Sequence, residues 1–216
     1  MKRLSELRGL RFPDIFVIRM FFKEGLQREP GRVLEFGCGN GNNLALFSEF
    51  GWDITGVDYN RNSLADARHN LEGIGHFIEC DLSLEFPTLD TPQFDAVLLP
   101  NLVYYLPRRR FELLLRECRR RVRSDGILFL SARLPEDWRW GRGKQEEPGG
   151  FRLECHETDE YGLLNVFYGA DELVQLIDEH FGPLQQQQRL RVSYENPAHG
   201  TIVRNAEMII WGRART

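Results

Sequence analysis

The chain has few cysteines and no pair of them in a C-x-x-C arrangement. The four that it has lie far apart in the sequence, at Cys38, Cys80, Cys118 and Cys155. Such spacing does not indicate a zinc site or a disulfide framework. We therefore expect free thiols, a reducing compartment such as the cytoplasm, and no metal.

A long apolar run is also missing. The stretch 15–22 is the best candidate, but Arg19 interrupts it and it is too short to span a bilayer. There is no internal repeat and no low-complexity linker, and 42% of the 216 residues are hydrophobic. We expect a single cytoplasmic domain over 1–216 that has no membrane partner.

An excess of positive charge is absent too, because the net charge is −4. This balance does not favour nucleic acid as a partner. Arginine clusters at 108–110 and 119–121 could contact RNA, but they are more typical of a solvated basic helix face.

The stretch 33–44 organises the chain. A short apolar strand ends in Gly37, Gly39 and Gly41, and a helix follows. Glycines let the backbone turn sharply and approach a ligand closely. The start of the helix points free N–H groups and a partial positive charge at that ligand. The pattern predicts a site for a nucleotide-like cofactor, with a tight structural turn as the alternative.

Two details bear on the choice of cofactor. A dinucleotide fingerprint, G-x-G-x-x-G, has its last glycine where this chain has Asn42. Glu35, two residues before the first glycine, would repel a pyrophosphate and favour a cationic ligand. A nicotinamide-dependent oxidoreductase is therefore the less favoured interpretation.

Hydrophobic periodicity predicts an amphipathic helix over 12–26, within an N-terminal helical segment 1–30. Residues that recur at helical spacing there are Phe12, Ile15, Phe16, Arg19 and Phe22. We expect this helix to pack on the sheet or to cover the ligand.

Strands and helices are expected to alternate along the rest of the chain. The expected strands are 32–37, 52–57, 75–80, 94–99, 126–132, 190–194 and 202–211, and the expected helices are 41–50, 60–71, 107–123 and 171–180. This alternation predicts a doubly wound α/β sheet. The stretch 133–168 departs from it and is expected to be a long irregular insertion.

Asp58 ends the second expected strand, at the distance from the glycines where an acidic side chain meets a ribose. Its carboxylate can accept hydrogen bonds from both ribose hydroxyls, or else cap the next helix. We expect Tyr59 either along an adenine ring or on the surface.

The order Glu35-x-Gly37-x-Gly39-x-Gly41 resembles motif I of the class I S-adenosylmethionine (SAM)-dependent methyltransferases. Residues 94–101 resemble motif IV of that family, and 120–130 resemble its post-motif. The resemblance implies a three-layer, doubly wound, seven-stranded α/β sheet of order 3-2-1-4-5-7-6, with strand 7 antiparallel. It also implies SAM as the cofactor and S-adenosylhomocysteine (SAH) as the product.

The resemblance implies a set of cofactor contacts. The glycine loop would meet the methionyl part, Asp81 and the next backbone N–H the adenine, and the end of motif IV the methionyl amine. An Asx-turn is the alternative role for Asp81. The cofactor residues expected in total are Glu35, Gly37, Cys38, Gly39, Asp58, Tyr59, Asp81, Leu82, Pro100 and Asn101.

Acceptor contacts are expected from two places. Tyr104 and Tyr105 follow motif IV, where many family members have an aromatic or histidine pair. Trp138 and Trp140 belong to the insertion 133–168, which we expect to act as a lid. Candidate general bases, or else ordinary loop histidines, are His156 and His199.

We expect methyl transfer from SAM to an oxygen or nitrogen atom of a small-molecule acceptor. The motif IV stretch 99–102 reads Leu-Pro-Asn-Leu and lacks the Asn-Pro-Pro-Tyr signature, so amide and exocyclic nitrogens are not favoured. An RNA or protein acceptor and a non-catalytic SAM-binding module are the alternatives.

Overall fold

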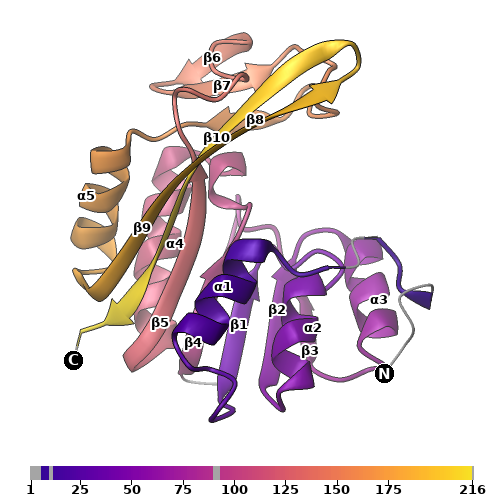
Figure 1. Ribbon diagram of the computed structural model, residues 1–216, viewed down its shortest axis with the longest axis vertical. Coiled ribbons are helices and arrows are strands. Elements are labelled where there is room, and N and C mark those ends of the chain that lie inside the picture. Colours follow the sequence, from indigo (N-terminus) through magenta and orange to yellow (C-terminus); the bar gives the residue numbers. More distant parts are fainter. Residues whose placement is uncertain (1–5, 10–11, 90–92, 216) are drawn as a thin grey trace.

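The computed structural model describes residues 6–9, 12–89 and 93–215. Its centre is a seven-stranded sheet of order β3-β2-β1-β4-β5-β10-β9 (Figure 1). Strands β1 to β5 pair in parallel and β10 runs antiparallel to β5, which confirms the expected order and direction. The strands are β1 Arg32–Phe36, β2 Asp53–Asp58, β3 His76–Glu79, β4 Phe94–Leu99, β5 Val122–Arg133, β9 Leu184–Ala198 and β10 Thr201–Ala214.

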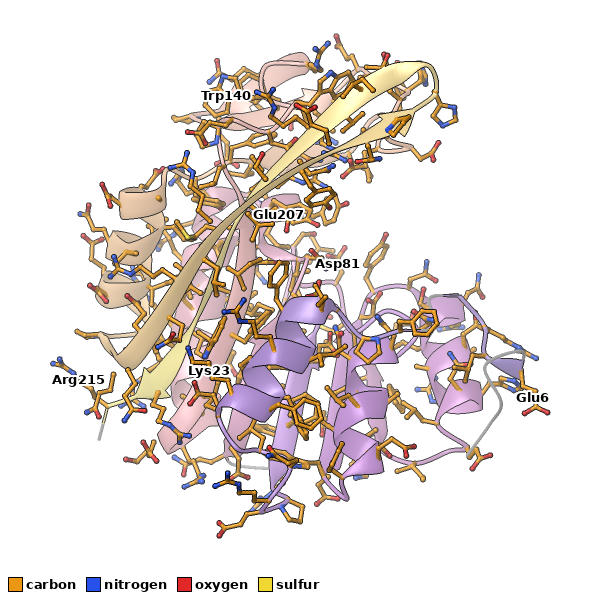
Figure 2. The ribbon with its side chains drawn as sticks, viewed as in Figure 1. Glu6, Lys23, Asp81, Trp140, Glu207 and Arg215 are labelled. Carbon is orange, nitrogen blue, oxygen red and sulfur yellow. The ribbon has the colours of Figure 1, made fainter. Side chains whose placement is uncertain are left out.

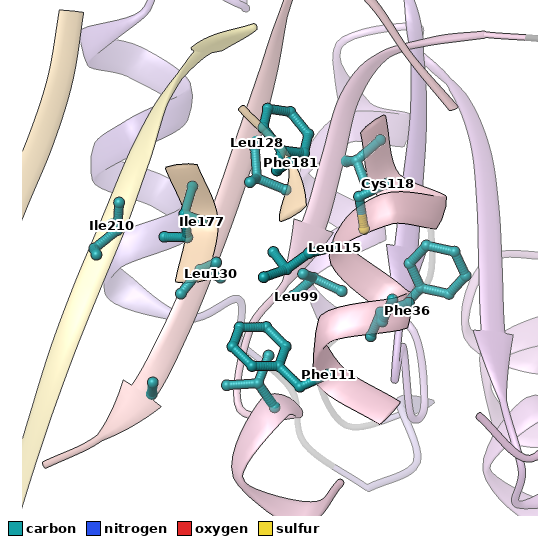
Figure 3. Close-up of a cluster of buried hydrophobic side chains, with 14 of the residues drawn as sticks. Phe36, Leu99, Phe111, Leu115, Cys118, Leu128, Leu130, Ile177, Phe181 and Ile210 are labelled. Atoms are coloured by element: carbon teal, nitrogen blue, oxygen red, sulfur yellow. The ribbon is translucent and has the colours of Figure 1, made fainter. Parts of the chain in front are cut away.

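Helices cover both faces of this sheet. One hydrophobic cluster joins the sheet to α1 (Ile15–Lys23), α2 (Asn42–Glu49) and α3 (Arg61–Asn70). A second cluster joins the other face to α4 (Arg108–Arg121) and α5 (Ala170–His180), as Figure 3 shows. Because both faces are covered, β4 is a nearly continuous apolar run.

The N-terminal helix is shorter than expected and presents a different face. The buried side chains of α1 are Val17, Met20 and Phe21, and the exposed apolar ones are Ile15 and Phe22. The expected apolar face is therefore wrong, since several aromatic side chains near this helix remain on the surface. Phe21 instead makes an edge contact with Phe47 of α2, with 4.8 Å between the ring centroids. Residues 1–5 and 10–11 of the expected N-terminal segment lie outside the described residues.

The stretch 133–168 is not irregular, so that expectation is wrong. It contains a three-stranded antiparallel sheet, formed by β6 (Gly143–Glu147), β7 (Gly150–Leu153) and β8 (Leu164–Val166). Figure 1 shows this small sheet at the top, beyond the carboxyl ends of the central strands. The strands have three to five residues and include glycine and charged side chains, so they carry little of the period-two apolar pattern that indicates a strand.

The last hairpin is longer than expected on both strands. β9 begins before the glutamine run 185–188 and is mostly exposed along its length. An edge strand with one solvated face tolerates such polar residues. The first part of β9 therefore lacks the apolar pattern that predicts a strand. β5 also begins earlier than expected, with exposed residues at 123–125.

No described helix combines the length and the apolar character needed to cross a membrane.

Candidate cofactor and acceptor site

A cavity of about 460 Å³ opens at the carboxyl edge of the central sheet. It lies where the strand order turns back from β1 to β4, the usual ligand position in doubly wound sheets. Its lining residues are Gly37, Asp58, Tyr59, Cys80, Asp81, Leu82, Ser83, Asn101, Leu102, Tyr105, Leu106, Leu163 and Leu164. Seven of the expected site residues are in this set.

The glycine loop shapes one wall. Gly37 has φ +73°, and a Cβ there would lie 3.0 Å from Leu102 Cδ1, so glycine is needed on both counts. Gly41 is the N-cap of α2 with φ +78°. Cys38 is buried beneath the loop, and burial raises the pKa of its thiol, so Cys38 is an unreactive packing residue.

Asp58 connects the glycine loop to the start of α3. Its Oδ2 accepts from the backbone N–H of Gly39 at 2.9 Å, and its Oδ1 accepts from that of Asn60 at 2.8 Å. The carboxylate is only 9% exposed and lines the cavity. Because each oxygen has a second acceptor position, the side chain can still receive two ligand hydroxyls. Tyr59 beside it is 69% exposed.

Asp81 begins the loop that follows β3. Its Oδ1 accepts from the backbone N–H of Ser83 at 2.9 Å, which is the Asx-turn alternative, while the residue also lines the cavity. Arg110 of α4 holds this loop from behind, with Nε donating to the Leu82 carbonyl at 2.8 Å and Nη2 to the Glu85 carbonyl at 3.0 Å. Sequence reasoning missed Arg110, because one arginine in a basic helix gives no sign of what it contacts.

Glu35 lies under the site rather than on the cavity surface. It is 1% exposed, and its Oε1 accepts from Asn43 Nδ2 at 2.7 Å. Its Oε2 is buried and has no hydrogen-bond partner among the residues that the structure describes. Burial raises the pKa of this carboxyl to about 8, despite the hydrogen bond from Asn43.

Asn101 joins the end of β4 to the start of α1. It has φ +53°, its backbone N–H donates to Ser131 Oγ at 2.8 Å, and its Nδ2 donates to Asp14 Oδ2 at 3.3 Å. Asp14 is the N-cap of α1. Pro100 is buried, which leaves Asn101 as the residue of this pair that lines the cavity.

The tyrosine pair lies between the cavity and the small sheet. Tyr105 lines the cavity, and its hydroxyl donates to Glu160 Oε1 at 2.7 Å. Burial raises the pKa of Tyr105 to about 12, so its hydroxyl keeps its proton at neutral pH. Tyr104 is 4% exposed and packs under the Arg133 guanidinium, 4.0 Å from the ring centroid.

Glu160 is the centre of a buried ion-pair network. It accepts from Arg133 Nη1 at 2.8 Å and also from Arg139 Nε. Arg139 in turn bonds Asp137 and Asn205, which attaches the small sheet to β10. The network therefore fixes the wall that carries Leu163 and Leu164.

The other expected acceptor residues lie away from the cavity lining. Trp140 packs on Phe151 and Phe167 of the small sheet and stands at the top of Figure 2, far from Asp81. Trp138 lies under Arg142. His156 stacks on Tyr161 with 4.2 Å between centroids, and His199 forms the tip of the last hairpin near Asp159. None of these four belongs to the described residues that line the cavity.

Sequence reasoning also missed part of the lining. Leu102 and Leu106 flank the expected tyrosine pair, so their position after motif IV was an available signal. Leu163 and Leu164 come from the small sheet, and no pattern in the sequence distinguished them within the insertion.

The site fits SAM better than a dinucleotide. Two carboxylates face a cavity that is otherwise largely apolar, and no lysine or arginine is found among its described lining residues. Pyrophosphate would lack a cation there, whereas hydroxyl and amino groups find acceptors. Glu35 Oε2 is buried beneath the glycine loop without a partner among the described residues, and a cationic group of a bound ligand would favour the ionised form of this carboxyl, whose pKa burial raises to about 8.

Comparisons with known proteins agree with this fit. Residues 34–130 match a methyltransferase domain family. The chain is 26% identical over 107 residues to the ubiquinone biosynthesis O-methyltransferase of Glaesserella parasuis serovar 5, a match that covers 46% of this chain and 44% of that one. The chain thus spans less than half the length of this curated relative.

Solved methyltransferase structures share the fold. A SAM-dependent methyltransferase of Methanosarcina mazei superposes with a TM-score of 0.67 at 18% identity, over 90% of this chain and 98% of that one. The 1,6-didemethyltoxoflavin-N1-methyltransferase of Burkholderia thailandensis, solved with SAH, has a TM-score of 0.61 at 18% identity, over 93% and 76%. Residues 34–130 thus match a methyltransferase domain, and the chain shares its fold with solved SAM-dependent methyltransferases, which supports SAM as the cofactor.

Proposed function

We propose that the protein transfers the methyl group of SAM to an oxygen or nitrogen atom of a small molecule. The observation that carries this proposal is the cavity with Asp58 and Asp81 on its wall at the turning point of the sheet. The names of an O-methyltransferase and an N-methyltransferase among the similar proteins support both acceptor atoms.

Within this proposal, the ribose of SAM lies at Asp58 and the adenine between Tyr59, Asp81 and Leu82. Glu35 and Asn101 act toward the methionyl end. SAM supplies an electrophilic methyl group, and the chain holds the donor and acceptor in line and shields them from water.

We further propose that residues 133–168 form the acceptor wall of a single domain. Leu163 and Leu164 line the cavity, and the Glu160 network attaches them to β5 and β10. An apolar wall of this kind suits a small organic acceptor.

An RNA acceptor has less support from the arginine clusters. Arg108 pairs with Glu172, Arg109 with Glu112, and both Arg120 and Arg121 with Glu117. Side chains committed to intramolecular ion pairs are a weak basis for phosphate binding.

Calorimetry with SAH, SAM and NADH tests the cofactor, and a coupled SAH-release assay over pools of phenols, amines and hydroxy acids tests the reaction. In the Asp58→Ala variant, we expect the free energy of SAH binding to weaken by about 1 to 3 kcal/mol, because two ribose hydroxyls lose their acceptor. An unchanged dissociation constant for that variant, or NADH binding in place of SAH, would reject the proposal.

A further inference from the structure

Glu207 is a carboxylate on the central sheet that the proposed cofactor contacts do not use. It lies on β10, opposite Arg133 of β5 and Val192 of β9. Arg133 is the last residue of β5, so Glu207 lies at the same carboxyl edge as the cavity. Figure 2 shows Glu207 above α1, at the edge of the sheet where Asp81 also lies.

The side chain faces α1. Ile209 and Trp211, two and four residues later, belong to the core cluster that β10 shares with α1. Because side chains alternate along a strand, Glu207 points to that same face. The N-cap of α1, Asp14, is therefore on its side of the sheet.

The Glu207 carboxylate is half-buried, and no hydrogen bond or ion pair within the described part of the chain engages it. Arg133, its cross-strand neighbour, is already bonded to Glu160 and Asn165 and stacked on Tyr104. Asp14 is engaged too, because Oδ1 caps α1 and Oδ2 accepts from Asn101. A partly desolvated carboxylate with free acceptor positions thus remains beside the site.

Burial raises the pKa of Glu207, and nearby charges act in both directions. Arg133 of β5, Asp14 before α1, and Asp137 and Arg139 of the loop after β5 affect the pKa of Glu207. Tyr104 and Tyr194 respond to its charge. A carboxyl group whose pKa is raised by desolvation is better suited to take up a proton than an exposed carboxyl group.

Glu207 is not among the described residues that line the cavity, and it lies behind the cavity wall on the β5 and β10 side of the sheet. Asn101, on the cavity wall, contacts both Asp14 and the Tyr104 hydroxyl, and these two groups are electrostatic neighbours of Glu207. The proposed ribose and adenine contacts come from the β2 and β3 end of the sheet, so they do not use the β5 and β10 side.

We propose that Glu207 receives the methyl acceptor, accepting a hydrogen bond from its N–H or O–H group and taking that proton during transfer. This inference rests on the proposed function. The acceptor's lone pair forms the new bond to carbon, the carbon–sulfur bond breaks with its electrons going to sulfur, and the proton passes to the Glu207 carboxylate. The substrate class is a neutral molecule with an ionisable amine or hydroxyl group.

Sinefungin is a direct probe, because it carries a primary amine where SAM carries its sulfonium methyl. The measurement is the ratio of the SAH and sinefungin dissociation constants, obtained by calorimetry. In the wild type, we expect sinefungin to bind more tightly than SAH. Glu207→Gln should reduce that preference about tenfold, the scale of one charge-assisted hydrogen bond, and leave SAH binding unchanged.

Glu179→Gln is the matched control, because Glu179 is an exposed α5 residue that accepts a hydrogen bond from Gln175. It should leave both dissociation constants unchanged. Glu35 does not affect the ratio, because the two ligands share the same methionyl end.

A second readout is the pH dependence of the preference in the wild-type protein. The carboxylate must be ionised to hold the amine, so the preference should grow as the pH rises beyond the ordinary titration range of a glutamate and be flat in Glu207→Gln. If the Glu207→Gln variant fails to fold, the pH dependence in the wild type tests the role of Glu207 by itself.

The outcomes separate the two proposals. Absence of SAH binding to the wild type would overturn the proposed function. Normal SAH binding with the same sinefungin preference in wild type and Glu207→Gln, or a wild-type preference that does not change with pH, would overturn the role of Glu207 alone.

Discussion

Glu35 has one carboxylate oxygen bonded to Asn43 and the other buried without a partner. In the unfolded chain this group has its ordinary pKa of 4.5, and in the folded protein the pKa is about 8. The folded state therefore holds a proton that the unfolded state releases. Stability from this group is complete below pH 4.5 and is lost as the pH rises toward 8.

Glu35→Gln keeps the acceptor for Asn43 and removes the titration. We expect the free energy of unfolding of the wild type to fall relative to the variant between about pH 5 and about pH 8. Urea unfolding across that range measures the difference, with the exposed Glu49→Gln as control. Parallel pH profiles for wild type and Glu35→Gln would contradict this account.

Site residues could be predicted from the sequence where a chemical group of the ligand requires a particular kind of side chain. Asp58 was placed by its distance from the glycines and Asp81 by its position after the third expected strand together with the family resemblance, and both line the cavity. His156 and His199 were chosen because histidine titrates near neutrality, which says nothing about position. A carboxylate such as Glu207 could not be selected from the sequence. Whether it is free to accept a hydrogen bond depends on which of its neighbours in the fold already have partners.

Among the elements, the loop after β3 depends on α4 for its shape. The Arg110 guanidinium bonds two of its carbonyls and lies over the Phe86 ring, 4.3 Å from the centroid. Leu82, which this contact fixes, is part of the proposed adenine site.

Arg110→Ala should weaken SAH binding by about 1 to 2 kcal/mol, because two hydrogen bonds that order the loop are lost. Arg109→Ala is the matched control on the same helix, since Arg109 is largely exposed and pairs only with Glu112. Calorimetry on both variants gives the comparison. Equal SAH affinities would show that α4 does not order the loop.

The small sheet depends in the same way on Glu160, which lies between two buried arginines. Burial opposes its ionisation, but Arg133 and Arg139 lower the net pKa of this carboxyl. Glu160→Ala leaves two buried cations without their partner and should reduce stability by about 3 to 5 kcal/mol.

The control for that change is Glu146→Ala, which removes an exposed pair with Arg152 in the small sheet and should have little effect. Thermal unfolding with hydrogen exchange over β6 to β8 locates the loss. If both variants melt like the wild type, the network does not hold the wall.

Elements with strong periodicity were predictable, and those without it were not. The apolar runs predicted the bounds of the parallel core strands to within one to a few residues, apart from the start of β5. The small sheet was not predictable in this way, because short strands with charged and glycine residues depend on tertiary contacts, such as the bonds from the Arg108 backbone of α4 to Glu147. The apolar face of α1 was wrong because aromatic side chains occur all around that helix, and only the packing on Phe47 decides which of them is buried.

At the scale of the whole molecule, the N-terminal segment is attached to the glycine loop at one end and to the last strand at the other. Asn42 Nδ2 donates to the Phe12 carbonyl at 2.7 Å, which fastens the segment over the glycine loop. Trp211 of β10 donates from Nε1 to Glu24 Oε1 at 2.9 Å, just after α1. The first contact lies at the glycine loop, and the second lies toward the amino edge of the sheet, because Glu24 also bonds Arg213, which bonds Asp125 near the start of β5.

The sheet order was predictable as a whole because it came from motifs in sequence order, not from single residues. The position of the acceptor site was harder to predict from the sequence, since it depends on how the hairpin β9–β10 and the small sheet meet above the core. These contacts join residues more than sixty positions apart, such as Arg139 and Asn205.

The central claim is that SAM occupies the cavity at the carboxyl ends of β1, β2 and β4. A crystal structure of the complex with SAH tests it most directly. We predict the ribose hydroxyls on the Asp58 carboxylate, the adenine against Leu82 with its amino group at Asp81, and the sulfur toward Asn101 and Glu207. SAH bound elsewhere, or bound in this cavity with its ribose away from Asp58, would contradict the account.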